Sequence, residues 1–380
     1  MAIALVLVLA TISFVSSKGY RIAATLFAIE LGAGPLQTGI LFALWGLFPF
    51  VLSIHAGRLA DRFDNRLLMV FGLAGFTLSL ALPFLFPSLG MLYVSAALGG
   101  LTSMVFVVAT QNLVGVFSTA ESRTRYFSYY ALGESAAAIA GPILVGLWID
   151  AFRHPITFLL LASVNAAALV LLLARRGSIP NTGRKEEKKV ARNAMELLAL
   201  PELRKALIAN GIVMAGLDLF GLYMPMYTHG LGFSATTIGL IMGAFGVAGF
   251  ITRLAIPPFT ARWGEHAIMA GALALSALAF IAVPLTSQPL LLGVCSFVLG
   301  LGLGCGQPLT MILAFNAAPA RRSAEAIAMR LAVSYGAHVV IPPVFGAVGA
   351  AMGLAPIFWT CAMLLGGGAV LTRPKKAVRQ

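Results

Sequence analysis

Long apolar runs without a charged side chain are the feature that most constrains the fold of this chain. The runs from Gly34 to Ala56 and from Leu67 to Val108 contain no Asp, Glu, Lys or Arg. A helix needs about 20 predominantly apolar residues to cross the hydrocarbon core of a bilayer. The whole chain is 59% hydrophobic and 10% charged, whereas soluble domains are about 25% charged. The sequence therefore predicts an all-α integral membrane protein.

Turn signals divide the apolar sequence into twelve predicted spanning helices. These are 4–29, 36–57, 67–86, 91–116, 126–149, 155–174, 205–229, 236–258, 267–285, 290–315, 326–349 and 354–372. The first ten residues also resemble the apolar part of a signal peptide. No basic segment precedes them, and Lys18 comes before any small-residue cleavage site, so we interpret them as the first span.

The two halves of the sequence repeat each other at a constant offset of 200 residues. The offset pairs identical residues at Leu31 and Leu231, Gly32 and Gly232, Gly39 and Gly239, Gly46 and Gly246, Phe50 and Phe250, Arg62 and Arg262, Met69 and Met269, Gly100 and Gly300, Thr110 and Thr310, Pro142 and Pro342, and Gly146 and Gly346. Because six helices return the chain to its starting side, the copies have the same orientation, related by an axis along the membrane normal. We expect six-helix bundles in 1–174 and 205–380, the second with a short cytoplasmic tail, joined by a cytoplasmic linker at 175–204.

The placement of the basic residues predicts the orientation. The chain has 26 Lys and Arg and a formal net charge of +13. All but Lys18, Arg21 and Arg153 fall at predicted cytoplasmic ends, loops or the tail, which is the positive-inside pattern. This pattern indicates a multi-pass protein of the cell inner membrane with both termini in the cytoplasm, and it explains the basicity without nucleic acid.

Motifs of soluble catalysis are missing from the sequence. The three cysteines lie in apolar runs, and no Cys/His spacing typical of a zinc site occurs. We find no phosphate-binding loop with its Lys and no nucleophile elbow. We therefore predict neither an enzyme nor a cofactor or metal, and a transporter of this sequence has to use a gradient instead of ATP.

The charged stretch 57–66 carries a family resemblance. It is similar to the signature loop between helices 2 and 3 of the major facilitator superfamily, G-x-L-A-D-R-x-G-R-R. The matching residues are Gly57, Leu59, Ala60, Asp61, Arg62 and Arg66, whereas Asp64 and Asn65 depart from the pattern. The resemblance implies a monomeric six-plus-six transporter with alternating access. It also implies that Gly57, Asp61, Arg62 and Arg66 form a conformational gate against helix 11, where Arg330 is a candidate partner of Asp61.

A second stretch, on the fifth span, resembles part of the antiporter motif G-x-x-x-G-P-x-x-G-G of the same superfamily. Gly141, Pro142 and Gly146 match, whereas Ala137 and Val145 replace two glycines. We expect these three matching residues to serve close helix packing. The motif points to export, although the fourth span lacks the central Arg that many proton antiporters of the superfamily carry.

Polar residues inside the spans are the candidate substrate site, because a charge at the centre of a helix costs about 2.5–3.5 kcal/mol to insert. Lys18 and Arg21 share one face of the first span with Ser17. They attract an anionic substrate group or pair internally with Glu134 and Asp218. The full set of predicted substrate-binding residues is Ser17, Lys18, Arg21, Gln111, Asp218, Tyr223 and Gln307.

Three titratable residues inside spans are candidates for proton coupling, namely Asp218, Glu134 and His338. The offset of 200 makes Asp218 the counterpart of Lys18, and we expect these two to form a pair that makes and breaks during the cycle. A permanent ion pair is the alternative. For Glu134 the alternative is pairing with Arg123 or Arg125, and for His338 it is a neutral ring bonded to a neighbouring helix.

The sequence thus favours a secondary active transporter that works by alternating access and exports a small organic molecule with proton coupling. A second hypothesis is uptake or exchange of a small organic anion bound by Lys18 and Arg21. A third, from another class, is a non-transporting membrane receptor or a lipid flippase. The expected partners are a small-molecule substrate, the lipid bilayer and protons.

Overall fold

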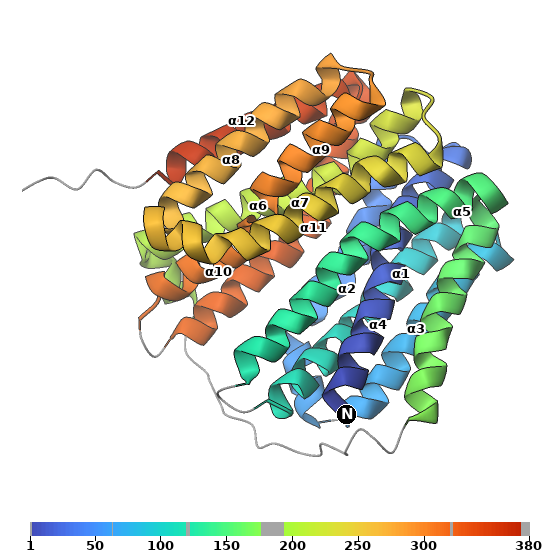
Figure 1. Ribbon diagram of the computed structural model, residues 1–380, viewed down its shortest axis with the longest axis horizontal. Helices are drawn as coiled ribbons and strands as arrows, with labels where there is room; N and C mark the ends of the chain where they lie inside the picture. Colours follow the sequence, from blue (N-terminus) through green and yellow to red (C-terminus); the bar gives the residue numbers. More distant parts are fainter. Residues whose placement is uncertain (1, 63, 119–121, 176–193, 320–321, 374–380) are drawn as a thin grey trace, which may run out of the picture.

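The computed structural model describes residues 2–62, 64–118, 122–175, 194–319 and 322–373. Within these ranges the side chains of 53–62, 123–124, 194–195 and 323–324 are not described. The helices are α1 Ala2–Glu30, α2 Pro35–Arg62, α3 Asn65–Leu85, α4 Leu89–Val116, α5 Arg123–Ala174, η2 Ala194–Ala199, α6 Pro201–Gly230, α7 Ala235–Trp263, α8 Glu265–Ala282, η3 Val283–Leu285, α9 Pro289–Leu303, α10 Gly306–Ala317, α11 Ser323–Met352 and α12 Ala355–Leu371 (Figure 1). The described residues contain no strand.

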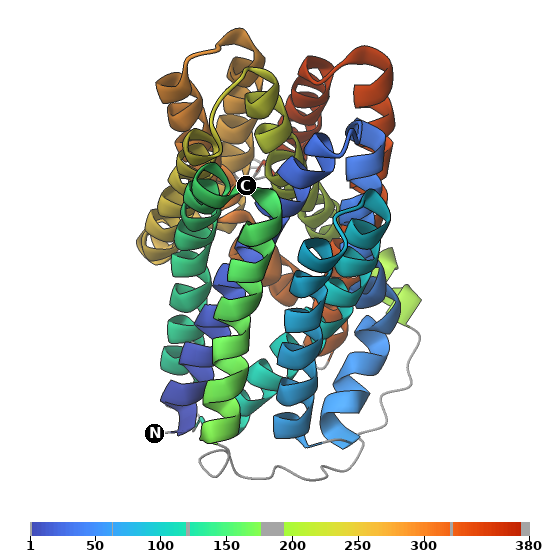
Figure 2. The same ribbon diagram turned by 90° about the vertical axis from the view of Figure 1, so that its right-hand side faces the viewer.

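Helices α1 to α5 pack mainly on one another, and so do α6 to α12 (Figure 1). In the first set α5 packs along α1 and α3, and in the second set α8 packs along α9 and α12. The two sets meet where α2 lies against α11, where α5 lies against α7 and where α1 faces α6. Figure 2 views the molecule from the side of the first set, which lies in front of the second, and the N-terminus lies at one end of the molecule.

Two glycines allow the backbones of the two sets to come very close. A Cβ atom on Gly39 of α2 would lie 2.4 Å from the carbonyl oxygen of Pro342 on α11. A Cβ on Gly239 of α7 would lie 2.5 Å from the carbonyl oxygen of Pro142 on α5. No other residue type fits these positions without displacing a helix. Because both glycines and both prolines are 200 residues apart, the sequence repeat reappears as a pair of matching helix contacts.

The repeat also determines two turns. Gly32 and Gly232 both have φ of +83°, which an L side chain rarely adopts. The bond from Gly32 N to Ile29 O is 2.9 Å long, and so is the bond from Gly232 N to His229 O. A glycine in this conformation ends a helix by satisfying its last carbonyl groups. The turns predicted at these two positions are confirmed.

One contact between the two sets has no counterpart in the repeat. The Asp150 carboxylate on α5 accepts hydrogen bonds from Ala235 N at 3.0 Å and from Thr236 N at 2.8 Å, at the start of α7. A carboxylate is favourable there because the first amides of a helix lack partners inside the helix. The offset places Ala350 at the equivalent position, so α2 cannot receive the same cap.

Several predicted boundaries are wrong. Helix α2 continues to Arg62, five residues past the predicted end, and α3 begins at Asn65, so most of the charged stretch 57–66 is helical and not loop. Helix α6 begins at Pro201. The span predicted at 290–315 is interrupted between Leu303 and Gly306. Our sequence interpretation treated the glycines there as part of an unbroken helix.

Helix α5 is too long for a single crossing. It has 52 residues, and its only non-helical backbone angles are at Arg153, with φ 66° and ψ 171°. At 1.5 Å per residue, a straight helix of this length would exceed twice the bilayer core. The break falls at the turn predicted between two spans. Ten helices of the described chain are long and apolar enough to cross a membrane, and the count of twelve crossings stays a prediction.

Candidate functional site

A cavity of about 290 Å³ lies between the two sets of helices. Its charged lining residues are Lys18 and Arg21 from α1, Glu134 from α5, Asp218 from α6 and Arg253 from α7. The ring of His338 from α11 completes the titratable groups among the described lining residues. These six residues form two clusters, each built around one carboxylate.

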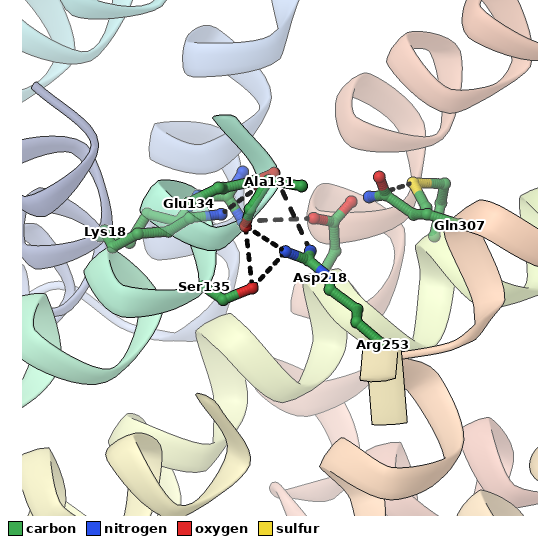
Figure 3. A network of polar contacts seen from close by, with 9 residues as sticks. Lys18, Ala131, Glu134, Ser135, Asp218, Arg253 and Gln307 are labelled. Atoms are coloured by element: carbon green, nitrogen blue, oxygen red, sulfur yellow. Dashed lines mark hydrogen bonds and ion pairs between the residues drawn. The ribbon is translucent and has the colours of Figure 1, made fainter. Parts of the chain in front are cut away.

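The first cluster, called here the Glu134 cluster, consists of Lys18, Glu134 and Arg253 (Figure 3). Lys18 Nζ lies 3.2 Å from Glu134 Oε1, within the first half of the chain. Arg253 Nη2 reaches Glu134 Oε2 from the second half at 3.9 Å. The same guanidinium donates to Ala131 O at 3.0 Å and to Ser135 Oγ at 2.5 Å. One carboxylate therefore bridges two cations that belong to different halves.

Close packing of α1 on α5 explains why Lys18 reaches Glu134. A Cβ on Gly141 would lie 2.9 Å from Gly19 N and 2.9 Å from Val15 O. Small residues at a helix contact let the two backbones approach, which brings side chains one or two turns away within reach. Ala131, Glu134 and Ser135 lie three and four residues apart, so all three face α7 on one side of α5.

The second cluster, called here the Asp218 cluster, consists of Arg21, Asp218 and His338. His338 Nδ1 lies 2.5 Å from Asp218 Oδ2, and Arg21 Nη1 lies 3.6 Å from Asp218 Oδ1. The side chain of Asp218 is only 1% exposed. Gly221, three residues farther along α6, leaves room for the Arg21 guanidinium, which also lies over the ring of Phe42 at 5.6 Å.

Aromatic side chains form part of the remaining cavity wall. Trp45, Phe220, Phe245 and Phe250 line it together with Met242. The rings of Phe220 and Phe245 stack with centroids 4.4 Å apart. A wall of this kind offers apolar contact to a ligand whose polar group reaches the charged clusters.

The interruption between α9 and α10 also reaches the cavity. Gly304 lines it, and Gln307 follows on the first turn of α10. Non-helical backbone at membrane depth is tolerated where it lines a cavity, because the freed polar groups can find partners there. Such discontinuous helices are a recurrent feature of substrate sites in transporters.

Of the nine residues predicted for substrate binding or proton coupling, seven line this cavity and two do not. Those on the lining are Ser17, Lys18, Arg21, Glu134, Asp218, Gln307 and His338. Gln111 is exposed on α4 and lies away from the lining. Tyr223 is fully buried and donates a hydrogen bond to Pro342 O at 2.9 Å, so it links α6 to α11. Neither residue lines the cavity, and a role of either in substrate binding stays a prediction.

The expected pair between Lys18 and Asp218 is not formed in this structure. Lys18 contacts Glu134, and Asp218 contacts Arg21 and His338. Internal pairing, the alternative considered for Lys18 and Arg21, is what the structure shows. Glu134 is accordingly paired through Lys18 and Arg253, and Arg125 lies over the ring of Tyr126.

The residues expected to pack helices lie at close contacts. Gly141 meets α1, Pro142 lies opposite Gly239, and a Cβ on Gly146 would lie 2.4 Å from Ala235 O. All three residues of α5 therefore lie where this helix contacts α1 or α7.

The expected gate falls mostly on undescribed side chains. Those of Gly57, Asp61 and Arg62 lie outside the described part of the structure. Arg66 is half-buried, and its backbone N–H donates to Asp64 at the start of α3. Arg330, the expected partner of Asp61, donates to Asn210 Oδ1 at 2.9 Å inside the second half.

Arg253 was not among the predicted site residues. Its charge was counted as cytoplasmic, although the residue lies five positions before the end of a predicted span. A lone charge inside an apolar span is the signal that should have identified it. Among the described residues, no group of three or more His, Cys, Asp or Glu side chains is placed to hold a metal ion.

Comparison with known proteins identifies the family. The sequence profile of the Major Facilitator Superfamily matches residues 6–208 and again residues 206–379. The chain belongs to the Major Facilitator Superfamily. Together the two matches cover nearly the whole chain.

Members of this superfamily with similar sequences include two resistance proteins. Multidrug resistance protein 1 of Bacillus subtilis (strain 168) is 25% identical over 249 residues, which cover 65% of this chain and 64% of that protein. The class C tetracycline resistance protein of Escherichia coli is 27% identical over 257 residues, covering 64% of this chain and 62% of that protein. The matched segments thus span less than two thirds of either relative.

A solved structure of another protein shares the fold of this chain. A point mutant of the nucleoside transporter NupG aligns over 98% of this chain and 99% of its own, with a TM-score of 0.86 and 13% identity. At this identity the likeness concerns the fold alone. It supports the all-helical architecture derived above.

Proposed function

We propose that this protein is a secondary active transporter that exports a small organic molecule by alternating access in a proton-coupled cycle. The substrate binds in the cavity between the two sets of helices. The six-helix bundles 1–174 and 205–380 are the moving units, and the protein works as a monomer in the inner membrane with both termini in the cytoplasm. The charged stretch 57–66, with Asp61 and Arg66, is the gate on the cytoplasmic side.

The observation that carries this proposal is the way charge is shared between the two halves. In each cluster the carboxylate lies closest to a partner from its own half, at 3.2 Å for Glu134 and 2.5 Å for Asp218. Its partner from the other half is farther away, at 3.9 Å and 3.6 Å respectively. Charges retained inside a membrane protein are costly and typically mark substrate or proton pathways. Pairs that cross the halves have to separate when the halves rock apart.

Two further observations support export. The two relatives are named for resistance to drugs and to tetracycline, and a transporter gives resistance by removing a compound from the cell. The aromatic wall of the cavity suits an organic molecule better than an inorganic ion.

Flux in proteoliposomes with a trapped pH indicator tests the proposal. The probes are naphthoate, naphthol and tetraphenylphosphonium, which are an anionic, a neutral and a cationic aromatic compound. We expect one of them to cross the membrane with a simultaneous proton movement, and we expect Asp218→Asn to abolish both. Glu265→Gln, a carboxylate outside the cavity, is the matched control and should behave like the wild type.

Three results would contradict the proposal. Flux that ignores an imposed pH gradient and is unchanged in Asp218→Asn and Glu134→Gln would exclude proton coupling. Binding of a probe without any flux would favour a receptor. Movement of fluorescent phospholipids between leaflets would favour a lipid flippase.

A second candidate function, uptake or exchange of a small organic anion, has its own supporting observation. The described cavity lining carries the cations Lys18, Arg21 and Arg253 but only the carboxylates Glu134 and Asp218. With His338 neutral, the lining has an excess of one positive charge. Naphthoate flux without flux of tetraphenylphosphonium would favour this candidate.

A further inference from the structure

The Glu134 cluster has the geometry of an occupied anion site. Its carboxylate uses one oxygen for Lys18 at 3.2 Å and the other for Arg253 at 3.9 Å. The two cations come from different halves of the chain. The carboxylate of Glu134 takes the position between them that a bound anion would take. A substrate carboxylate placed between Lys18 and Arg253 would make the same two ion pairs.

Exposure distinguishes this carboxylate from the other one. The side chains of Lys18, Glu134 and Arg253 are 37%, 34% and 33% exposed. The side chain of Asp218 is 1% exposed. A ligand in the cavity can therefore reach and replace Glu134, whereas Asp218 stays enclosed between Arg21 and His338.

We propose that Glu134 is an internal occupant of this anion site, which it yields to the anionic group of an aromatic organic acid while taking up one proton. The inference rests on the carrier function proposed above and names its substrate class. The aromatic part of the ligand lies against Phe220, Phe245 and Phe250. A volume of about 290 Å³ is near the lower end of the ~300–1,000 Å³ usual for drug-sized ligands, so the ligand is small.

The exchange leaves the net charge of the site unchanged when Glu134 takes up one proton. In the empty site, Lys18 and Arg253 with the Glu134 carboxylate have a net charge of +1. In the loaded site, the same two cations with a protonated Glu134 and one bound anion again have +1. An anion that entered without a proton would leave two carboxylates competing for the same cations, and like charges at this separation disfavour each other's ionised form.

The other charged groups near Glu134 remain in place during this exchange. Tyr130, one turn earlier on α5, lies 3.3 Å from Thr110 on α4 through its hydroxyl. Arg21 of α1, Asp218 of α6 and His338 of α11 form the neighbouring cluster, in which the carboxylate already has two partners. The proton is therefore taken up at the carboxylate that loses its cations.

Coupling between proton and substrate follows from this geometry. The proton and the anion bind together and cross the membrane in the same direction, and the concentration gradients determine that direction. Under an inward proton gradient such a carrier takes the anion up, as in the second candidate function, and it exports the anion when the outward anion gradient exceeds the proton gradient. The charge of the site is the same when it is empty and when it is loaded.

Titration calorimetry of the purified full-length protein with naphthoate tests this inference. Comparison of two buffers that differ in ionisation enthalpy counts the protons taken up on binding. Naphthoate stays ionised between about pH 6 and 8, as carboxylates do. Because one proton is linked to each anion, we expect uptake of about one proton and an affinity that falls up to about tenfold per pH unit as pH rises.

Three variants separate Glu134 from the rest of the site. Glu134→Gln imitates the protonated acid, so it should bind naphthoate without proton uptake and without pH dependence. Arg253→Gln should lose most of the binding, and Arg253→Lys should retain part of it because the charge is kept. Glu265→Gln is the control and should match the wild type in affinity and in proton uptake.

Several outcomes would overturn the inference. One is binding of naphthoate to the wild type without proton uptake. A second is binding of tetraphenylphosphonium without binding of naphthoate. A third is that the wild type binds neither compound. The wild-type proton count needs no variant, so a Glu134→Gln protein that does not fold leaves the test intact. Flux of tetraphenylphosphonium would refute the anion site but keep the carrier function. Proton-linked naphthoate binding without flux would keep the anion site and refute the carrier function.

Discussion

The Glu134 cluster and the Asp218 cluster use similar groups in opposite surroundings. Each holds one carboxylate between a close partner from its own half of the chain and a more distant partner from the other half. The Glu134 side chain is 34% exposed to the cavity, whereas the Asp218 side chain is 1% exposed. The same ion pair therefore has different consequences in the two places.

Burial decides which carboxylate can exchange its partners. Breaking an enclosed ion pair lowers the free energy of unfolding by about 3–5 kcal/mol, because removal of one partner leaves an uncompensated charge. A pair in contact with water is worth only about 0–1 kcal/mol. We therefore assign Asp218 to holding the two halves together at this depth, and Glu134 to reversible chemistry with substrate and proton.

The largest expected effect comes from Asp218→Asn. It removes the charge of a carboxylate that is 1% exposed and leaves Arg21, which is 30% exposed, without this partner. We therefore expect a loss of about 3 kcal/mol in unfolding free energy, the lower end of the range for a broken enclosed pair, together with the loss of flux. Thermal unfolding in detergent and flux in proteoliposomes measure the two effects. A variant as stable as the wild type would show that the clusters do not differ in the way proposed here.

Gly239→Ala should have the next largest effect. The new Cβ would lie 2.5 Å from the carbonyl oxygen of Pro142, and overpacking of this kind costs about 1–3 kcal/mol. Separation of α5 from α7 should break the pair between Glu134 and Arg253 and leave the Asp218 cluster unchanged. Stability and naphthoate binding measure this. Gly271→Ala is the matched control, because nothing lies within 4 Å of its Cβ position, and equal losses in both variants would contradict the steric explanation.

Asp150→Asn should have a smaller effect, on a contact between the halves that belongs to neither cluster. The amide keeps the shape of the side chain but removes the charge from the start of α7, which is worth about 0.3–1 kcal/mol. The population with α5 and α7 apart at this end should rise, as measured by spin-label distances between the two helices. Unchanged distances would mean that Asp150 contributes no conformational bias.

Glu134→Gln should change stability least. Its ion pairs are in contact with the cavity, so we expect a change within about 1 kcal/mol in unfolding free energy. Thermal unfolding should therefore show a much smaller shift than in Asp218→Asn. A loss as large as that of Asp218→Asn would show that both carboxylates are structural, and it would remove the physical basis for exchange at Glu134.

Much of the fold was predictable from local patterns in the sequence. The turns at Gly32 and Gly232 and the break at Arg153 were predicted from glycine, proline and charge, because these residues interrupt apolar helices wherever they occur. The repeat offset predicted two halves of the same orientation, whereas the paired contacts at Gly39 and Gly239 became visible only in the structure. Helix ends were less accurate, as α2 shows, because charged residues can extend a helix into water without changing its apolar span.

The candidate site was predictable as a set of residues but not as a set of partners. Lys18, Arg21, Glu134 and Asp218 stood out because a charge in an apolar span is costly. The same reasoning should have included Arg253, which was set aside as a cytoplasmic charge. Gln111 shows the converse limit, since a polar side chain on a span need not line the cavity.

By itself, the sequence determined that this chain is an all-helical membrane protein built from two repeated halves, because apolar length, turn residues and internal similarity are properties of the chain alone. Only the tertiary structure decided that Glu134 joins Lys18 to Arg253 and that Asp218 is enclosed by Arg21 and His338. Those partners depend on how closely helices approach, which glycines such as Gly141 and Gly239 allow through contacts far apart in the sequence. Exposure has the same origin, since a side chain is buried by its neighbours in space.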